Sequence, residues 1–255
     1  MPATDLLLVS GISKHFGGLS ALTDVSFSIG RGEIYALIGP NGAGKTTLFN
    51  VITGIYSPDS GSFCLNGQNM AGRKASAMAK AGIARTFQNI RLFSNMTALE
   101  NVMVGRHSRT RAGVFGAIFR NASSIREEQQ IAARARDLLS YVGISRHEHM
   151  LARNLSYGDQ RRLEIARALA TDPMLLALDE PAAGMNHSDT DSLRILLERI
   201  RMDGVTILLI EHDVKLVMGI CDRLCVLNFG HKIAEGTPEE VRSNPAVIEA
   251  YLGNS

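Results

Sequence analysis

The chain carries apolar residues in patterns that predict regular structure. Short runs at 6–9, 25–29 and 33–38 have the length and composition of strands, with glycine-rich turns between them. A continuous apolar run at 174–178 fits a parallel strand that is buried on both faces, and another strand is predicted at 205–210. We therefore expect an α/β fold in which short antiparallel strands form an edge that leads into the first buried strand.

The middle of the chain, from 89 to 154, follows a helical pattern with little strand signal. Thr97 with Glu100, and Ser124 with Glu127, have the spacing of capping boxes, in which a hydroxyl and a carboxylate bond the unpaired N–H groups of a first helical turn. The second box opens a run of apolar residues at the 3.6-residue period. We expect this region to form an inserted helical lobe.

Size and composition are those of an ordinary globular protein. The chain has 255 residues, of which 45% are hydrophobic and 20% charged, so it can bury a sizeable core. No segment approaches about 18 uninterrupted apolar residues, and the first residues lack the features of a secretion signal, so we expect a cytoplasmic protein. A net charge of +2 is too near balance to argue for nucleic-acid binding. Cys64, Cys221 and Cys225 are expected to be free thiols; a metal-binding pair of the last two is the alternative.

The strongest chemical signal is the pattern G-x-x-x-x-G-K-[ST] at Gly39 to Thr46, which we call the phosphate loop. It follows an apolar run and precedes a helix-compatible run, as a nucleotide-binding loop requires. The glycines let successive N–H groups point inward, and the helix N-terminus adds partial positive charge. Lys45 can reach the β- and γ-phosphates, and the Thr46 hydroxyl can hold Mg²⁺. The candidate nucleotide contacts here are Gly39, Asn41, Gly42, Ala43, Gly44, Lys45, Thr46 and Thr47.

Two adjacent carboxylates, Asp179 and Glu180, close the apolar run at 174–178. Such a pair is costly at the end of a buried strand unless it serves a cation or a reaction. Asp179 suits coordination of Mg²⁺. Glu180, which points the other way, suits polarising water for attack on the γ-phosphate. The alternative is an ordinary solvated strand end.

Three further side chains are candidates by position. Gln88 follows a short strand pattern and could orient Mg²⁺ and the attacking water; a polar strand-edge residue is the alternative. His212 follows the strand at 205–210, where open α/β sheets gather their ligands, and could bond the γ-phosphate, although a single histidine is more often structural. Phe16 lies beside two glycines and could stack on adenine, although a core position is the commoner one for phenylalanine.

Ser156 and Gly158 lie at the start of another expected helix, which runs to about Thr171. Ser156 and Asp159 have the spacing of a helix cap. A capped helix start with glycine close by can also accept a phosphate. These residues alone favour an ordinary cap.

Taken in order, the motifs resemble the ATP-binding subunit of an ATP-binding-cassette (ABC) transporter over essentially the whole chain. The matching segments are the phosphate loop, Gln88, Leu155-Ser156-Tyr157-Gly158-Asp159, Leu178-Asp179-Glu180-Pro181 and His212, with Phe16 where that family places an adenine-stacking aromatic. The resemblance implies a P-loop NTPase core of residues 1–88 and 161–255 with an antiparallel β edge. It also implies that residues 89–160 form an inserted α-helical subdomain with the signature motif. It reverses the interpretations of Phe16 and Ser156 in favour of nucleotide contacts.

Longer segments resemble the branched-chain amino acid importer subgroup. They are Arg85-Thr86-Phe87-Gln88, the run from Leu155 to Glu164, Glu180-Pro181-Ala182-Ala183-Gly184 and the end Ala250-Tyr251-Leu252-Gly253. Related subunits for urea, amides or lipopolysaccharide share parts of them. The chain departs from the family at two places. Tyr157 and Asp159 replace a glycine and the glutamine of the usual L-S-G-G-Q signature, and Asn186 stands where the segment after the catalytic glutamate usually ends in aspartate.

The resemblance implies an ATPase that uses ATP and Mg²⁺ to energise an importer. Two cassettes, identical or homologous, would pair head to tail, so that Ser156 and Gly158 of one meet the γ-phosphate bound by the other. The other partners would be two membrane permeases and a solute-binding protein, with no nucleic acid, at the cytoplasmic face of the inner or plasma membrane. A soluble ABC-type ATPase, in iron–sulfur assembly or translation, is the competing function. A phosphate-loop kinase is a third, which would leave Ser156 to Asp159 unexplained.

Overall fold

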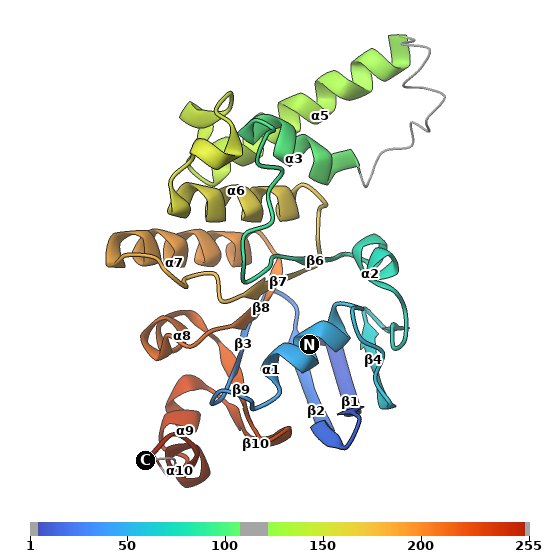
Figure 1. The fold of residues 1–255 in the computed structure, drawn as a ribbon, viewed down its shortest axis with the longest axis vertical. Coiled ribbons are helices and arrows are strands. Elements are labelled where there is room, and N and C mark those ends of the chain that lie inside the picture. Colours follow the sequence, from blue (N-terminus) through green and yellow to red (C-terminus); the bar gives the residue numbers. More distant parts are fainter. Residues whose placement is uncertain (1–4, 108–121, 253–255) are drawn as a thin grey trace. The chain divides into compact units, whose positions relative to one another are not determined.

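The computed structural model describes residues 5–107 and 122–252, which form two compact units (Figure 1). The first unit contains the residues up to Arg85 and from Met174 onward, and the second is Thr86–Pro173. The structure thus groups Gln88 and residues 161–173 with the helical unit, whereas the expected division placed them in the core. The reason is packing, because helix α6 (Tyr157–Leu169) lies against the other long helices of the second unit.

The first unit contains a four-stranded antiparallel sheet of order β2-β1-β4-β5. Its strands are β1 (Asp5–Phe16), β2 (Leu19–Gly30), β4 (Ser60–Leu65) and β5 (Gln68–Asn69). β1 and β2 have 12 residues each, so the expectation of short edge strands was wrong. The pairing of these two strands shifts register between Val9 and Ile12 and again beyond, and such bulges interrupt the two-residue alternation by which a strand is recognised.

A second sheet in the same unit has the order β10-β9-β3-β8-β7-β6 and is parallel except at β10. Its strands are β3 (Ile34–Ile38), β6 (Ile83–Arg85), β7 (Leu175–Asp179), β8 (Thr206–Ile210), β9 (Arg223–Asn228) and β10 (His231–Gly236). Every residue of β3, β7 and β8 is buried, which confirms that continuous apolar runs mark strands covered on both faces.

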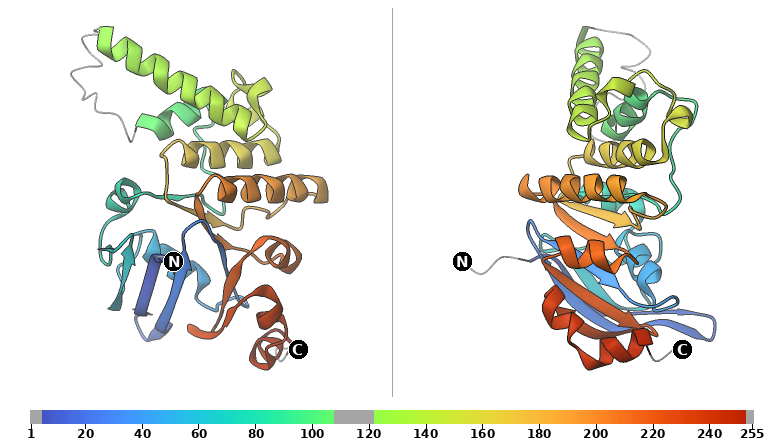
Figure 2. Two further views of the ribbon diagram at one scale, coloured as in Figure 1. Left: turned by 180° about the vertical axis from the view of Figure 1, so that it is seen from behind. Right: turned by 90° about the vertical axis from the view of Figure 1, so that its left-hand side faces the viewer.

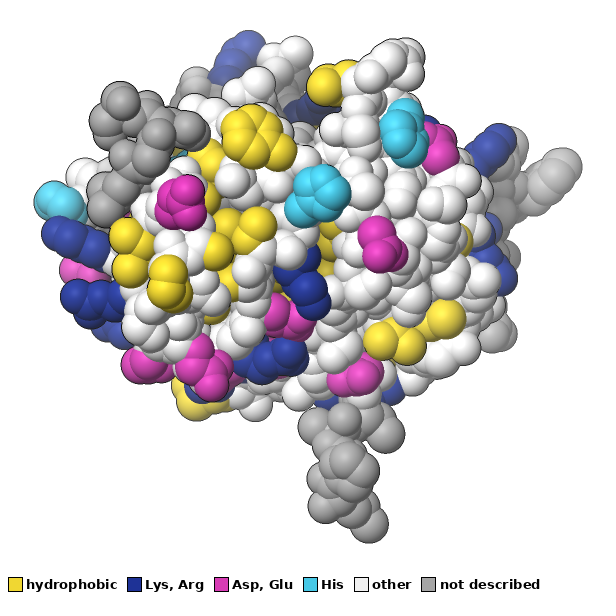
Figure 3. All heavy atoms as spheres, turned by 90° about the horizontal axis from the view of Figure 1, so that it is seen from below, with side chains coloured by type: hydrophobic (Ala, Val, Ile, Leu, Met, Phe, Trp, Pro, Cys, Tyr) yellow, Lys and Arg dark blue, Asp and Glu magenta, His cyan; other side chains and the backbone are white. Residues whose placement is uncertain are grey.

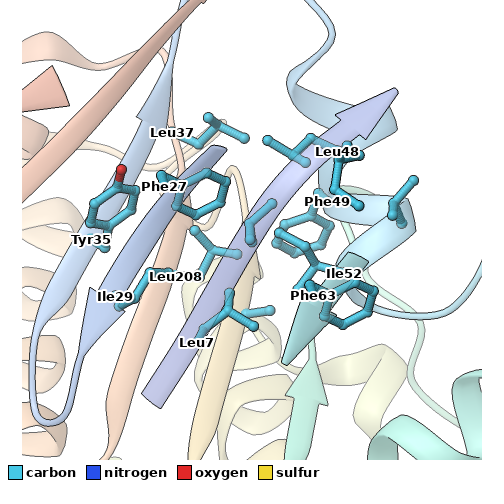
Figure 4. Packing of buried hydrophobic residues seen from close by; sticks show 14 of the residues in the cluster. Leu7, Phe27, Ile29, Tyr35, Leu37, Leu48, Phe49, Ile52, Phe63 and Leu208 are labelled. Carbon is cyan, nitrogen blue, oxygen red and sulfur yellow. The ribbon is translucent and has the colours of Figure 1, made fainter. Parts of the chain in front are cut away.

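The helices of the first unit are α1 (Lys45–Ile52), α2 (Ala75–Ala81), α7 (His187–Met202), α8 (Val214–Ile220), α9 (Pro238–Arg242) and α10 (Pro245–Leu252). The main core joins α1 to both sheets (Figure 4). Phe49 on α1 is fully buried and shares this cluster with Leu7 and Phe63 of the antiparallel sheet and Leu37 and Leu208 of the parallel one. The helix that begins at Lys45 is therefore anchored by apolar burial.

The second unit is built from helices α3 (Ala98–His107), α5 (Ala122–Tyr141) and α6, with single 3₁₀ turns at Ser145–His147 and Ala152–Asn154 (Figure 2). α3 packs on both α5 and α6. The capping box at α3 is confirmed: the Thr97 N–H donates to Glu100 Oε2 at 2.7 Å, and the Glu100 N–H donates to Thr97 Oγ1 at 3.2 Å. The expected cap at Ser124 involves a side chain outside the described part.

Within residues 5–107 and 122–252, no helix has the length and apolar character needed to cross a bilayer.

Replacing Phe49 by alanine should destabilise the first unit, because a fully buried ring is lost from the core beneath α1. We expect a loss of about 3–5 kcal/mol. The matched control is Phe229→Ala, since Phe229 is 73% exposed and should change stability by less than about 0.5 kcal/mol. Urea denaturation followed by circular dichroism measures both, and equal midpoints would contradict the assignment of Phe49 to the core.

Candidate active site

The phosphate loop connects the buried strand β3 to helix α1, and two of its glycines are required by the backbone. Gly39 has φ 148°, and a Cβ there would lie 2.1 Å from the carbonyl oxygen of Leu227 on β9. Gly44 has φ 102°, and a Cβ there would lie 2.6 Å from the carbonyl oxygen of Ala21. Any larger residue would push the loop away from the sheet. Close approach to two neighbouring strands thus fixes where the loop can bind an anion.

Lys45 is the first residue of α1 and is almost fully buried. Its Nζ donates to the carbonyl oxygens of Gly39 at 2.7 Å and Pro40 at 3.0 Å. Burial lowers the pKa of Lys45, while the negative charge of Glu180 acts in the opposite direction. Thr46, the next residue, is exposed. The loop therefore presents an ammonium group inside its curve and a hydroxyl at its surface.

Asp179 ends strand β7 and is buried. Arg85, at the end of the neighbouring strand β6, places its guanidinium 3.4 Å from Asp179 Oδ2. The same guanidinium donates to Asn50 Oδ1 at 2.7 Å and Thr53 Oγ1 at 2.8 Å, and it lies 4.6 Å from the centre of the Phe49 ring. Arg85 therefore joins the strand end that carries Asp179 to the helix that carries Lys45.

Glu180 and His212 meet where β7 and β8 end side by side. Glu180 Oε1 lies 2.8 Å from His212 Nε2. The backbone of Glu180 is left-handed, with φ 47°, and its N–H donates to the carbonyl oxygen of Ile210 at 2.9 Å. A non-glycine residue in this conformation is strained, and such strain is concentrated at functional sites. The structure therefore brings together the carboxylate of Glu180 and the imidazole of His212, which lie far apart in the sequence.

Glu211 is a residue that the sequence reasoning passed over as a strand end. The residue is 4% exposed. Its Oε1 accepts the N–H of Ala182 at 2.7 Å, and its Oε2 accepts the N–H of His212 at 3.1 Å. Burial raises the pKa of Glu211, backbone N–H groups oppose this, and the charge of Glu180 adds to the rise. One carboxylate thus fixes both the segment after Glu180 and the segment that carries His212. The sequence does contain a signal for Glu211, because its carboxylate stands directly beside the candidate His212 at the end of a predicted strand.

Phe16 ends strand β1 and is 41% exposed, so it is not a core residue. Its ring packs edge to face on Tyr56, with centroids 5.2 Å apart, and Lys14 Nζ lies 5.5 Å from its centroid. Part of the ring remains accessible. The candidate site residues that lie in the first unit are Phe16, the phosphate loop, Asp179, Glu180 and His212.

The other candidates, Gln88, Ser156 and Gly158, belong to the second unit. Ser156 is exposed at the start of α6, and its Oγ accepts the N–H of Asp159 at 3.2 Å, which confirms the cap. Gly158 is buried in the first turn of the helix. Gln88 is exposed, and its backbone carbonyl oxygen accepts a hydrogen bond from Arg161 Nη2 at 2.8 Å.

The donor set around the phosphate loop suits a metal ion held mainly by phosphate oxygens. Among the described residues, no group of three or more His, Cys, Asp and Glu side chains is arranged to hold a metal. Thr46 and Asp179 supply a hydroxyl and one carboxylate, which matches the way Mg²⁺ binds with nucleotide phosphates. The cysteines are free, and burial raises the pKa of Cys225 to about 12, so this thiol stays protonated.

Comparison with known proteins places this site in a family. The family described as "ABC transporter" matches residues 22–183, and "Branched-chain amino acid ATP-binding cassette transporter" matches residues 231–255. The chain is 47% identical to the high-affinity branched-chain amino acid transport ATP-binding protein LivG of Escherichia coli (strain K12), over 98% of both chains. It is 45% identical, with the same coverage, to the corresponding protein BraF of Pseudomonas aeruginosa.

A solved structure agrees with these relatives. The ADP conformation of MJ1267, an ATP-binding cassette of an ABC transporter, superimposes with a TM-score of 0.86 at 33% identity and covers 98% of this chain and 99% of that one. The expectation of a P-loop NTPase core with an inserted helical subdomain is confirmed. The chain belongs to the ABC transporter family and is one of its ATP-hydrolysing cassettes.

Proposed function

We propose that this chain is the energy-coupling ATPase of an importer for branched-chain amino acids. The observation that carries the proposal is identity of 47% over 98% of the chain to a branched-chain amino acid transport protein, together with the family match at residues 231–255. Both favour the importer over a soluble ATPase with no membrane partner.

ATP binds with its phosphates in the phosphate loop and its adenine against the accessible part of Phe16. Lys45 exchanges the carbonyl oxygens that its Nζ now contacts for the β- and γ-phosphates, a charge-assisted bond that is stronger than the neutral one it replaces. The loop backbone from Asn41 to Gly44 and the side chains of Thr46 and Thr47 complete the cradle. The ADP complex of a cassette at 33% identity supports nucleotide binding by this fold.

Thr46, Asp179 and Gln88 would hold Mg²⁺, which neutralises charge between the β- and γ-phosphates when it is bound. Asp179 is suited to this task because it ends the buried strand β7 and because Arg85 orients its carboxylate from 3.4 Å away. On this proposal the side-chain amide oxygen of Gln88 would be the third ligand, as the motif order of the family implies, and it would also orient the attacking water.

Glu180 is the general base. Its carboxylate accepts a proton from the water that attacks the γ-phosphate, and His212 Nε2, 2.8 Å from Oε1, keeps the carboxylate in place and can turn to bond a γ-phosphate oxygen. Glu211 is a positioning residue for both groups, because it accepts the N–H of Ala182, two residues after Glu180, and the N–H of His212 itself.

The site is completed by a second cassette. Ser156 and Gly158 lie at the N-terminus of α6, a helix of 13 residues whose first N–H groups favour a phosphate. The order of the motifs resembles a family in which such a signature meets the nucleotide held by a second cassette. We therefore infer a head-to-tail pair, of two copies or of this chain and a homologue, in which each signature meets the ATP held by the other subunit. ATP closes the pair, and hydrolysis loosens it.

The remaining partners are two membrane permeases and a solute-binding protein, with this chain peripheral at the cytoplasmic face of the membrane. Nucleic acid is not a partner on this proposal. The net charge is only +2, and on the face drawn in Figure 3 the described acidic and basic side chains lie intermixed with hydrophobic ones.

Replacing Glu180 by glutamine should abolish turnover and leave ATP binding intact, because the general base is lost while the phosphate loop is unchanged. We expect kcat to fall by about 10²–10⁴-fold. The ATP-bound protein should then accumulate as a pair, which size-exclusion chromatography detects. Glu198→Gln is the matched control, since Glu198 pairs with Arg194 one turn earlier on α7.

The same Glu180→Gln exchange in the source cells tests the transport assignment. Uptake of labelled leucine, isoleucine and valine should be lost, whereas uptake of labelled lysine should persist. Unchanged uptake of all three branched-chain amino acids would contradict the importer assignment, even if ATP hydrolysis is lost.

Ser156→Ala should reduce hydrolysis while ATP binding by the isolated subunit stays normal, and Lys45→Ala should weaken binding by about 1.5–3 kcal/mol. Mixing the two inactive proteins should restore activity, because one of the two composite sites in a mixed pair then has both wild-type Lys45 and wild-type Ser156. A steady-state ATPase assay measures this. Failure of the mixture to exceed either variant alone would count against the shared site.

Glu211→Gln should lower kcat with little change in KM for ATP, because a neutral amide has one acceptor oxygen for backbone N–H groups that now use two. An unsatisfied buried donor costs about 1–3 kcal/mol, so we expect kcat to fall about tenfold. Steady-state kinetics against the Glu198→Gln control provide the test. A change in KM alone would assign Glu211 to nucleotide binding instead.

A further inference from the structure

Arg161, on the second turn of α6, is the largest fully buried side chain in the described part of the protein. Its Nη1 donates to the carbonyl oxygen of Phe87 at 2.7 Å, and its Nη2 donates to that of Gln88 at 2.8 Å. A planar guanidinium that bonds two successive carbonyls holds the backbone in one orientation. The segment that carries Gln88 is therefore fixed to the signature helix within the second unit.

Glu164, one turn further along α6, holds the same segment by accepting hydrogen bonds from the backbone N–H groups of that segment. Its Oε1 accepts from Phe87 at 3.3 Å and from Arg91 at 3.4 Å, and its Oε2 lies 2.9 Å from Arg161 Nη1. Both side chains are buried. Burial raises the pKa of Glu164, and the charge of Arg161 opposes the rise. Neither group of such a buried pair can move far without leaving the other unpaired, so a shift of the Arg161 guanidinium carries the Glu164 carboxylate and the segment from Phe87 to Arg91 with it.

Tyr157 connects this pair to the signature motif. It is the first residue of α6, between Ser156 and Gly158, and its hydroxyl accepts a hydrogen bond from Arg161 Nη2 at 3.1 Å. Its ring is 45% exposed. The same Nη2 group therefore contacts the Tyr157 hydroxyl and the Gln88 carbonyl. The Nε of Arg161 finds no acceptor among the described residues. The arginine is thus placed to reach these two groups at the expense of one of its own hydrogen bonds.

We propose that Tyr157, Arg161 and Glu164 are positioning residues that couple nucleotide contact at the signature motif to the backbone around Gln88. The inference rests on the proposed function, in which Ser156 and Gly158 meet the ATP of the second subunit. When that contact moves the start of α6, the Tyr157 hydroxyl shifts Arg161, and Arg161 shifts the carbonyls of Phe87 and Gln88. The coupling is reciprocal, so a movement at Gln88 alters the signature in turn. The tyrosine that departs from L-S-G-G-Q thereby acquires a role.

Tyr157→Phe separates coupling from simple support of the fold, because it removes one hydroxyl and leaves both the ring and the Arg161–Glu164 pair. Hydrogen–deuterium exchange of the full-length protein, in the Glu180→Gln background with and without saturating ATP and Mg²⁺, reads the segment 87–93 directly. ATP should slow exchange there about fivefold in the parent and by less than about twofold with Tyr157→Phe. Without ATP, the two proteins should exchange alike.

Two controls make the result specific. Tyr141→Phe removes a tyrosine hydroxyl from α5 in the same unit and should keep the full response to ATP. Arg161→Lys should instead speed amide exchange at Phe87 and Arg91 before ATP is added. The substitution removes the guanidinium that bonds the carbonyl oxygens of Phe87 and Gln88 and so loosens the whole segment. Protection of residues 39–47 by ATP reports nucleotide binding in every variant.

The outcomes separate this inference from the proposed function. An undiminished response of segment 87–93 in Tyr157→Phe, or no response in the parent, overturns the coupling while ATP binding and pairing stand. Absence of ATP protection at 39–47 in the parent overturns the proposed function and the coupling with it.

Discussion

The parallel pairing of β3, β8 and β7 places the carboxyl ends of these strands at one edge of the sheet. β3 leads into the phosphate loop, β7 into Asp179 and Glu180, and β8 into Glu211 and His212. Charged groups far apart in the sequence therefore meet without any loop having to be long or flexible, as is usual where open α/β sheets bind ligands. The apolar strands make the edge rigid, and the charges stand only at their ends.

A site with so many carboxylates needs its charges placed individually. Arg85 stabilises Asp179 from the neighbouring strand, and His212 contacts Glu180. Glu211 is held by backbone N–H groups, which supply partial positive charge without adding a mobile side chain. The left-handed backbone at Glu180 is tolerated because two hydrogen bonds hold the chain there. The Glu180 N–H donates to the carbonyl oxygen of Ile210, and the Ala182 N–H donates to Glu211 Oε1.

Local sequence was sufficient to select the candidates whose proposed role follows from their place at a strand end. The phosphate loop and the groups Asp179, Glu180 and His212 were found in this way. It was insufficient for Glu211 and Arg161, because each acts on backbone atoms distant in sequence: Ala182 is 29 residues from Glu211, and Phe87 is 74 from Arg161. The lengths of β1 and β2 were missed because bulges interrupt the alternation of apolar and polar residues along these strands. The grouping of α6 with the second unit follows from its packing on α3 and α5, which a boundary placed at the signature motif leaves out.

The two departures from the family pattern differ in what the local structure makes of them. Asn186 is the N-cap of α7: its Oδ1 accepts the N–H of Asp189 at 2.9 Å, and its Nδ2 donates to Asp189 Oδ2 at 2.9 Å. Aspartate caps a helix as well as asparagine does, but it has no N–H to donate to a second carboxylate. Asn186 is thus explained by its own helix. Tyr157 is not, because its hydroxyl bonds an arginine that also holds the backbone carbonyls of Phe87 and Gln88, 74 and 73 residues away in the chain. The effect of Asn186 is confined to its own helix, because its side-chain hydrogen bonds lie within the first turn. Tyr157 instead bonds the buried guanidinium of Arg161, and so it links the signature motif to the backbone carbonyls that Arg161 holds.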